Sequence, residues 1–191
     1  MNTRQFIDIM SIAEKLKNNT RHSWTSSNRH ESVAEHSWRL SLMAYLVKDE
    51  FPDADINKVI LMCIWHDIGE AITGDIPAFV KTESDETVEN DAVSDLLWSL
   101  PQPYKTELLE LFLEMNKQET VEAKIYKALD KMEALIQHNE ADLSTWIPLE
   151  YEANLWYGKK EVEFSDYMKE LKQTIYEDSI EKINGGKKDI V

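Results

Sequence analysis

Apolar side chains recur at steps of three and four residues along most of this chain, the spacing that places them on one face of an α-helix. Glycine and proline, which interrupt helices, number only five each among 191 residues. The alternation of polar and apolar residues that marks half-buried strands is not a feature of the sequence. We therefore expect an all-α fold. The length suits one domain with a sizeable core.

The helical spacing divides the chain into segments joined by short polar connections. Expected features include a turn over residues 73–77, an acidic and solvated stretch over residues 83–95, and a frayed, disordered tail over residues 185–191. The predicted helices span about residues 3–17, 32–51, 55–67, a segment that opens at 101–103, 119–139, a segment that ends at 156, and 164–183.

Residues 20–29 are polar and show no helical spacing, so they are interpreted as an irregular loop. This loop contains Arg21 and Trp24, and a tryptophan is seldom left fully exposed. We therefore regard the loop as a candidate wall of a substrate site.

Lysine and arginine total 21 against 36 aspartate and glutamate residues, which gives a net charge of −15. A field of this sign repels polyanions, so nucleic acid polymers and anionic membranes are not expected partners. A small phosphorylated substrate remains compatible, because a metal ion and a few arginines can outweigh a distant negative surface. The N-terminus lacks a signal-peptide pattern, and a lone cysteine, Cys63, allows no intramolecular disulfide. We expect a cytoplasmic protein.

The apolar run from Val59 to Trp65 ends in two adjacent polar residues, His66 and Asp67. Burying both without partners is unfavourable, whereas a divalent cation neutralises the carboxylate and occupies the imidazole lone pair. His36 lies on the apolar stripe of the preceding helix and points toward the core. Such nitrogen and oxygen donors suit Co²⁺, Mn²⁺, Zn²⁺, Fe²⁺ or Mg²⁺. These residues predict a divalent-metal site.

Three blocks in order sharpen this prediction: Glu-Ser-Val-Ala-Glu-His-Ser at 31–37, His-Asp-Ile-Gly-Glu at 66–70 and Thr-Gly-Asp-Ile-Pro at 73–77. With Asp130 downstream, they resemble the signature of the HD-domain superfamily of metal-dependent phosphohydrolases, and in particular its 5′-deoxynucleotidase branch. The resemblance implies a single-domain helical bundle of HD type over residues 1–184. It also implies removal of the 5′-phosphate from nucleoside monophosphates, chiefly 2′-deoxyribonucleotides, by a protein that commonly forms homodimers.

The same resemblance implies that four residues bind the metal: His36, His66, Asp67 and Asp130. Helical periodicity alone treats Asp130 differently, because this residue lies off the apolar stripe that includes Leu129 and Met132. Its role as a ligand depends on the resemblance.

Two carboxylates and two loop residues complete the implied site. Glu70 is the acid or base beside the metal, and it faces the same way as His66 if the helix continues through both. Asp75 matches a position that the family uses near the attacking water and the sugar. Arg21 and Trp24 are candidates for the arginine and tryptophan that meet the phosphate and the deoxyribose, although Trp24 lies nearer His36 than the family's spacing predicts.

His22, His30 and His138 have no matching sequence context and are interpreted as solvated or capping residues. Two alternative functions stay open: a nucleotide-binding regulatory HD module without turnover, and an HD oxygenase with a dinuclear iron site.

Overall fold

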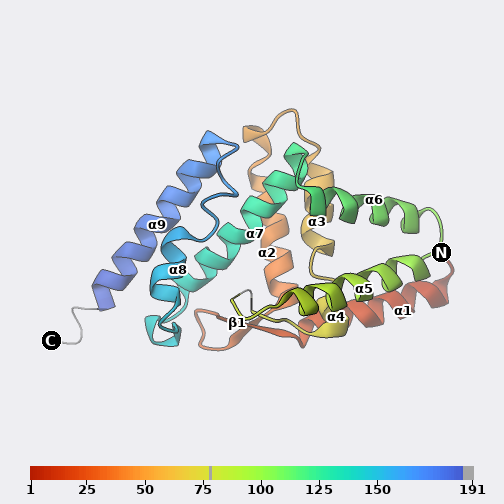
Figure 1. Cartoon of the computed structure of the whole chain (residues 1–191), viewed down its shortest axis with the longest axis horizontal. Helices are drawn as coiled ribbons and strands as arrows, with labels where there is room; N and C mark the ends of the chain where they lie inside the picture. Colours follow the sequence, from red (N-terminus) through yellow and green to blue (C-terminus); the bar gives the residue numbers. More distant parts are fainter. Residues whose placement is uncertain (78, 187–191) are drawn as a thin grey trace.

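The computed structural model describes residues 1–77 and 79–186, and helices make up most of it (Figure 1). This confirms the all-α prediction, with one small sheet in addition. Among the described residues, no helix has both the length and the apolar character that a membrane crossing requires. The helices are α1 (Thr3–Glu14), η1 (Lys15–Lys17), α2 (Val33–Leu46), η2 (Lys48–Glu50), α3 (Ile56–Trp65), α4 (Glu70–Thr73), α5 (Glu83–Ser99), α6 (Tyr104–Lys117), α7 (Val121–Glu140), η3 (Leu143–Thr145), α8 (Glu150–Trp156) and α9 (Asp166–Gly186).

The core forms around α7, which packs against α2 and α3 on one side and against α9 on the other (Figure 1). Leu129 and Met132 of α7 are fully buried, and they belong to one apolar cluster with Leu40 of α2 and Met62 of α3. Burial of each such side chain contributes roughly 1.5–3 kcal/mol. The helix that carries Asp130 is therefore held by packing on more than one side.

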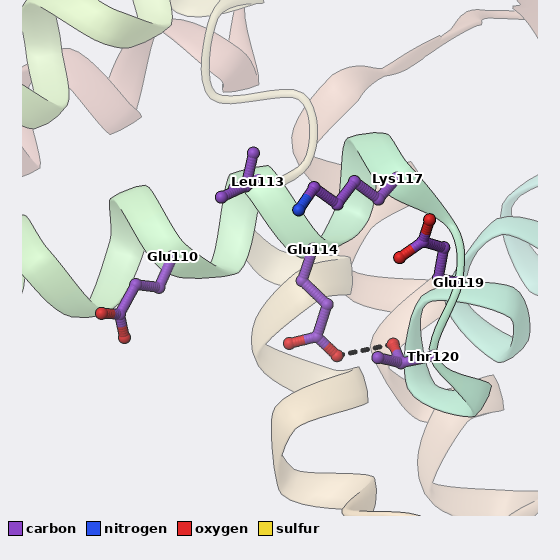
Figure 2. Close-up of a pocket in the computed structure, with 6 residues that line it drawn as sticks. All are labelled: Glu110, Leu113, Glu114, Lys117, Glu119 and Thr120. Atoms are coloured by element: carbon purple, nitrogen blue, oxygen red, sulfur yellow. Dashed lines mark hydrogen bonds between the residues drawn. The ribbon is translucent and has the colours of Figure 1, made fainter.

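Polar contacts with α6 and α3 fix the start of α7. The Thr120 hydroxyl accepts a hydrogen bond from the Ala123 N–H at 3.3 Å. It donates one to Glu114 of α6 at 2.6 Å (Figure 2). Lys58 of α3 forms an ion pair with the same Glu114 at 2.9 Å. A capped N-terminus tied to two neighbouring helices sets the register of α7. The surface pocket in Figure 2 borders this contact between α6 and the start of α7. Its lining residues are Glu110, Leu113, Glu114, Lys117, Glu119 and Thr120.

Residues 20–32 form a β-hairpin, so the prediction of an irregular loop at 20–29 was wrong. Strand β1 (Thr20–Trp24) pairs antiparallel with β2 (His30–Ser32), with an irregular register between the two paired ends. The strands are short and polar, and the buried residue within β1 is Ser23, so no apolar alternation marks them. The hairpin leads directly into α2, whose N-cap is Ser32 in a capping box with Glu35.

The structure also corrects two predicted helix ends. Helix α3 ends at Trp65, so the prediction of a helix through Asp67 was wrong. Residues 66–69 form a turn before α4, and His66 and Glu70 therefore do not share one continuous helix. At the C-terminus, Gly185 and Gly186 belong to α9, which runs beyond its predicted end. The rest of the expected tail, residues 187–191, lies outside the described residues.

Candidate active site

Four side chains converge where α2, α7 and the turn after α3 meet. Nε2 of His36 lies 3.2 Å from Oδ1 of Asp130, and Nε2 of His66 lies 2.9 Å from Oδ2 of Asp67. The cross distances are 3.9 Å from His36 to Asp67 and 3.8 Å from His66 to Asp130. The structure therefore brings together the whole set of residues predicted to bind metal.

Hydrogen bonds orient both imidazoles toward this centre. Nδ1 of His66 donates to the backbone carbonyl of Cys63 at 2.8 Å, and Nδ1 of His36 is bound to the Glu133 carboxylate. Because Nδ1 of each ring is held from behind, Nε2 of each ring points to the centre. Metal-binding histidines are usually held in this way by a carbonyl or carboxylate behind the ring.

An unpaired ring nitrogen at the centre fits a divalent cation. Nε2 of His66 is buried and has no hydrogen-bond partner among the described residues, although an oxygen of Asp67 is only 2.9 Å away. A ring nitrogen and a carboxylate oxygen that lie this close without a hydrogen bond are placed as two ligands of one ion would be. Burial favours the neutral form of Asp67, yet His66 and His36 hold the pKa of its carboxyl below the usual value. The aspartate is therefore ionised, as a ligand must be.

Asp130 reaches the centre although it lies off the apolar stripe of α7. Its side chain is largely buried and also forms an ion pair with Lys127 at 2.9 Å. Periodicity failed here because it assumes one buried face, whereas α7 contacts helices on more than one side. A second face of α7 is thus available to line the site.

A layer of charged residues behind the centre was missed in the sequence. Glu133, fully buried, binds both His36 and the guanidinium of Arg39, the latter at 2.6 Å. Glu31, also buried, lies 3.4 Å from Arg21. The spacing held a usable signal, because Glu133 follows Asp130 by three residues and Arg39 follows His36 by three.

The centre opens into a cavity of about 310 Å³, onto which Asp67 and Asp130 face. Charged groups and apolar side chains share its walls, a combination typical of small-molecule sites. The lining residues are Arg21, His22, Asp67, Glu70, Asp75, Ile76, Pro77, Phe79, Lys81, Lys127, Asp130, Lys131, Ala134, Leu135, His138, Leu149, Glu150, Ala153, Asn154, Trp156 and Tyr157.

Glu70 and Asp75, the predicted catalytic pair, both line this cavity. Glu70 is only 6% exposed, and its Oε2 atom has no hydrogen-bond partner among the described residues. Burial, and next the neighbouring Asp67 carboxylate, raise the pKa of Glu70 to about 10. Burial likewise raises the pKa of Asp75. A carboxyl group that holds its proton beside a cation-binding centre is suited to proton transfer.

The two predicted substrate contacts separate in the structure. Arg21 lines the cavity, and its guanidinium lies 3.7 Å from Asp67. Trp24, the last residue of β1, is not among the described residues that line the cavity. Its ring instead lies against His30, with 4.1 Å between ring centroids. The structure therefore brings Arg21 to the site and leaves Trp24 on the hairpin.

Together, the fold and the site define a helical-bundle protein with a centre of two histidines and two aspartates at the end of a cavity. The chain belongs to the HD domain family, whose profile matches residues 13–172.

Two relatives illustrate the similarity in sequence. The 5′-deoxynucleotidase HDDC2 of Bos taurus is 34% identical over 141 residues, which cover 72% of this chain and 68% of that protein. The 5′-deoxynucleotidase hdd1 of Schizosaccharomyces pombe is 30% identical over 159 residues, 74% of this chain and 78% of that protein.

Solved structures share the fold. A predicted metal-dependent phosphohydrolase from Magnetospirillum magnetotacticum superposes with a TM-score of 0.78 at 26% identity, over 92% of this chain and 91% of that one. A conserved hypothetical protein from Pyrococcus furiosus gives 0.70 at 31% identity, over 90% and 98% of the two chains.

Proposed function

We propose that this protein is a metal-dependent phosphohydrolase that removes the 5′-phosphate from nucleoside monophosphates, with 2′-deoxyribonucleotides as the main substrates. The observation that supports this proposal most directly is that Glu70 lines the same cavity as Asp67 and Asp130. The names of the relatives, both 5′-deoxynucleotidases, support the substrate class.

The four-donor centre would hold the divalent cation. When bound, such a cation withdraws charge from a phosphate oxygen and makes a nearby water more acidic. Arg21 would bind the phosphate: its guanidinium is largely buried, faces the cavity, and stays charged because the Asp67 and Glu133 carboxylates outweigh the effect of burial on its pKa. Two N–H groups of one guanidinium can hold a phosphate in a fixed orientation.

Glu70 would transfer the proton. Its carboxyl group lines the cavity next to Asp67 and keeps its proton because burial raises its pKa, so it can donate a proton to the leaving 5′-oxygen and then accept one from the attacking water. Asp75 lies in the segment that follows α4 and lines the same cavity, where its carboxyl group can orient the water or the sugar.

The test is a panel of deoxy- and ribonucleoside monophosphates, each assayed with Co²⁺, Mn²⁺, Zn²⁺, Fe²⁺ and Mg²⁺. We expect phosphate release that requires a divalent metal and is faster for deoxynucleotides. Asp67→Asn is the inactive control, and the surface variant Glu110→Gln should match the parent. Tight nucleotide binding without release of phosphate would contradict the proposal and favour the regulatory module.

We propose further that the protein acts in the cytoplasm as a homodimer. The outward face of α2 supports self-association, because it carries exposed apolar side chains: Trp38, Leu42, Tyr45 and Leu46. Sedimentation analysis should give a dimer that Leu46→Glu dissociates, whereas Leu113→Glu, at an exposed apolar residue of α6, should not. A monomeric parent would exclude the dimer, and cell fractionation tests the location.

A further inference from the structure

A second group of metal-binding side chains lines the same cavity. It contains His22 of β1, His138 near the end of α7 and Glu150 at the start of α8. Oε1 of Glu150 lies 2.8 Å from Nε2 of His22 and 3.4 Å from Nε2 of His138. The three donor atoms all lie within 4.8 Å of one another. Three elements that are distant in sequence thus bring two imidazoles and one carboxylate to a single point.

Two of these side chains are oriented from behind. Nδ1 of His138 lies 3.0 Å from the side-chain oxygen of Asn154, so Nδ1 donates and Nε2 keeps its lone pair. Oε2 of Glu150 accepts the backbone N–H of Ile147 at 2.8 Å, which leaves Oε1 directed at the histidines. Burial lowers the pKa of His138, so this imidazole is neutral at neutral pH, as a ligand must be.

We propose that His22, His138 and Glu150 bind a second divalent cation of the borderline class, such as Zn²⁺ or Co²⁺. Two imidazoles and one carboxylate form a known three-ligand set for zinc, with a fourth position left open. Here, the open position would face the cavity that all three residues line. Supporting bonds behind the ligands, as at Asn154 and Ile147, are typical of built metal sites.

The second site is separate from the centre at Asp130. Asp130 and His138 lie on the same helix, eight residues apart, which is about 12 Å along its axis. The two ions of a dinuclear centre lie only about 3.5–4 Å apart. The proposal is therefore two independent mononuclear sites, which differs from the dinuclear site of an HD oxygenase and does not depend on the phosphohydrolase activity.

Without an ion, the same residues can satisfy one another by hydrogen bonds. Nε2–H of His22 can donate to Glu150, and the Ser23 hydroxyl lies 3.2 Å from Nε2 of His138. A purely hydrogen-bonded cluster is thus the competing interpretation. It predicts no second ion, and a count of bound ions distinguishes the two.

The experiment is a Zn²⁺ titration of the full chain, followed by calorimetry and by elemental analysis after gel filtration. We expect two ions per chain in the parent and one in Asp67→Asn, held at the second site. In that background, His22→Ala or Glu150→Gln should weaken binding of the remaining ion at least ~10–100-fold, the loss seen even for outer-shell changes. Zn²⁺ should also raise the Tm of Asp67→Asn but not that of Asp67→Asn/His22→Ala.

The matched control is His30→Ala, which removes an exposed histidine of the same hairpin outside the cluster and should bind as the parent does. His22 is the most exposed of the three side chains and is therefore the main variant, and circular dichroism verifies that each variant is folded. A parent that binds one ion would overturn the proposal. So would unchanged Zn²⁺ affinity in Asp67→Asn/His22→Ala, or loss of both ions in Asp67→Asn, which would indicate a dinuclear centre.

Discussion

At the scale of single residues, Glu70 has a carboxyl oxygen, Oε2, without a hydrogen-bond partner in the part of the chain that the structure describes. We expect Glu70→Gln to keep its metal and to lower kcat by about 10²- to 10⁴-fold, because positioned proton transfer typically contributes that much. Metal analysis and steady-state rates on the preferred monophosphate measure the two effects. Glu110→Gln, at an exposed glutamate of α6, is the control. Loss of metal would make Glu70 a ligand, and an unchanged rate would make it structural.

Arg21 and Trp24 lead to opposite expectations. Arg21 faces the cavity and reads the phosphate that both sugar types share, so Arg21→Gln should lower kcat/KM equally for deoxy- and ribonucleotides. Trp24 packs on His30 outside the cavity, so Trp24→Ala should leave the ratio of the two kcat/KM values unchanged. The measurement compares both sugars with one base. A smaller preference for deoxynucleotides in Trp24→Ala would contradict this expectation and would indicate that the tryptophan contacts the sugar.

At the scale of secondary structure elements, the sequence predicted the helices well and their connections poorly. The long amphipathic segments, such as α7, carry strong periodicity, and α2 has a recognisable capping box at Ser32. The hairpin was missed because its strands are short and polar and are held by contact with α7, which no local pattern records. The turn at 66–69 was missed because the apolar run leads into it without glycine or proline until Gly69.

The residues of the candidate site were likewise only partly predictable from the sequence. Motif blocks predicted His36, His66, Asp67, Glu70 and Asp75, because these residues lie in short stretches of sequence that resemble the HD-domain signature. Glu133 and the cluster around Glu150 were missed, because they acquire partners only when distant segments of the chain pack together.

An ion pair between the hairpin and α2 should make the free energy of unfolding depend on pH in the acidic range. Arg29 donates two hydrogen bonds to Glu35, at 2.8 and 2.6 Å, and these lower the pKa of Glu35 from 4.5 to about 2. The stabilisation is complete above the unfolded value and is lost as the pH falls from 4.5 toward 2. Between pH 7 and about pH 3, the free energy of unfolding should therefore fall less in Glu35→Gln than in the parent.

Urea unfolding at both pH values gives the free energies for this comparison. Arg29→Gln should reduce the acid dependence in the same direction, whereas Glu110→Gln should behave as the parent. Equal acid sensitivity in Glu35→Gln and the parent would show that the ion pair makes no contribution. The effect should be modest, because both side chains are substantially exposed.

At the scale of the whole molecule, the metal centre joins α2, the turn after α3, and α7. A cation that binds only the folded chain should raise the Tm, with about 2.7 kcal/mol gained at a concentration of 100 times Kd. Mn²⁺ is the appropriate probe, because its preference for oxygen ligands favours the centre with two carboxylates over the cluster at Glu150. Differential scanning calorimetry with and without Mn²⁺ gives the shift.

Asp67→Ala should abolish activity and the Mn²⁺-dependent rise in Tm, while Asp130→Ala should retain a smaller rise. His30→Ala serves as the control with normal binding. A full Mn²⁺ response in Asp67→Ala would contradict the assignment of the centre.

The capped, tightly packed helix α7 supplies Asp130 to one cluster and His138 to the other. The number of residues between these two positions therefore sets the distance between the clusters. Because successive residues turn by about 100°, insertion of one alanine between these positions would swing one side chain out of the cavity while the other stayed in place. A substitution can alter one cluster and leave the other intact, whereas an insertion or deletion within this span changes the position of one cluster relative to the other. Evolution of this cavity should therefore tolerate new side chains along α7 far more readily than a change in its length.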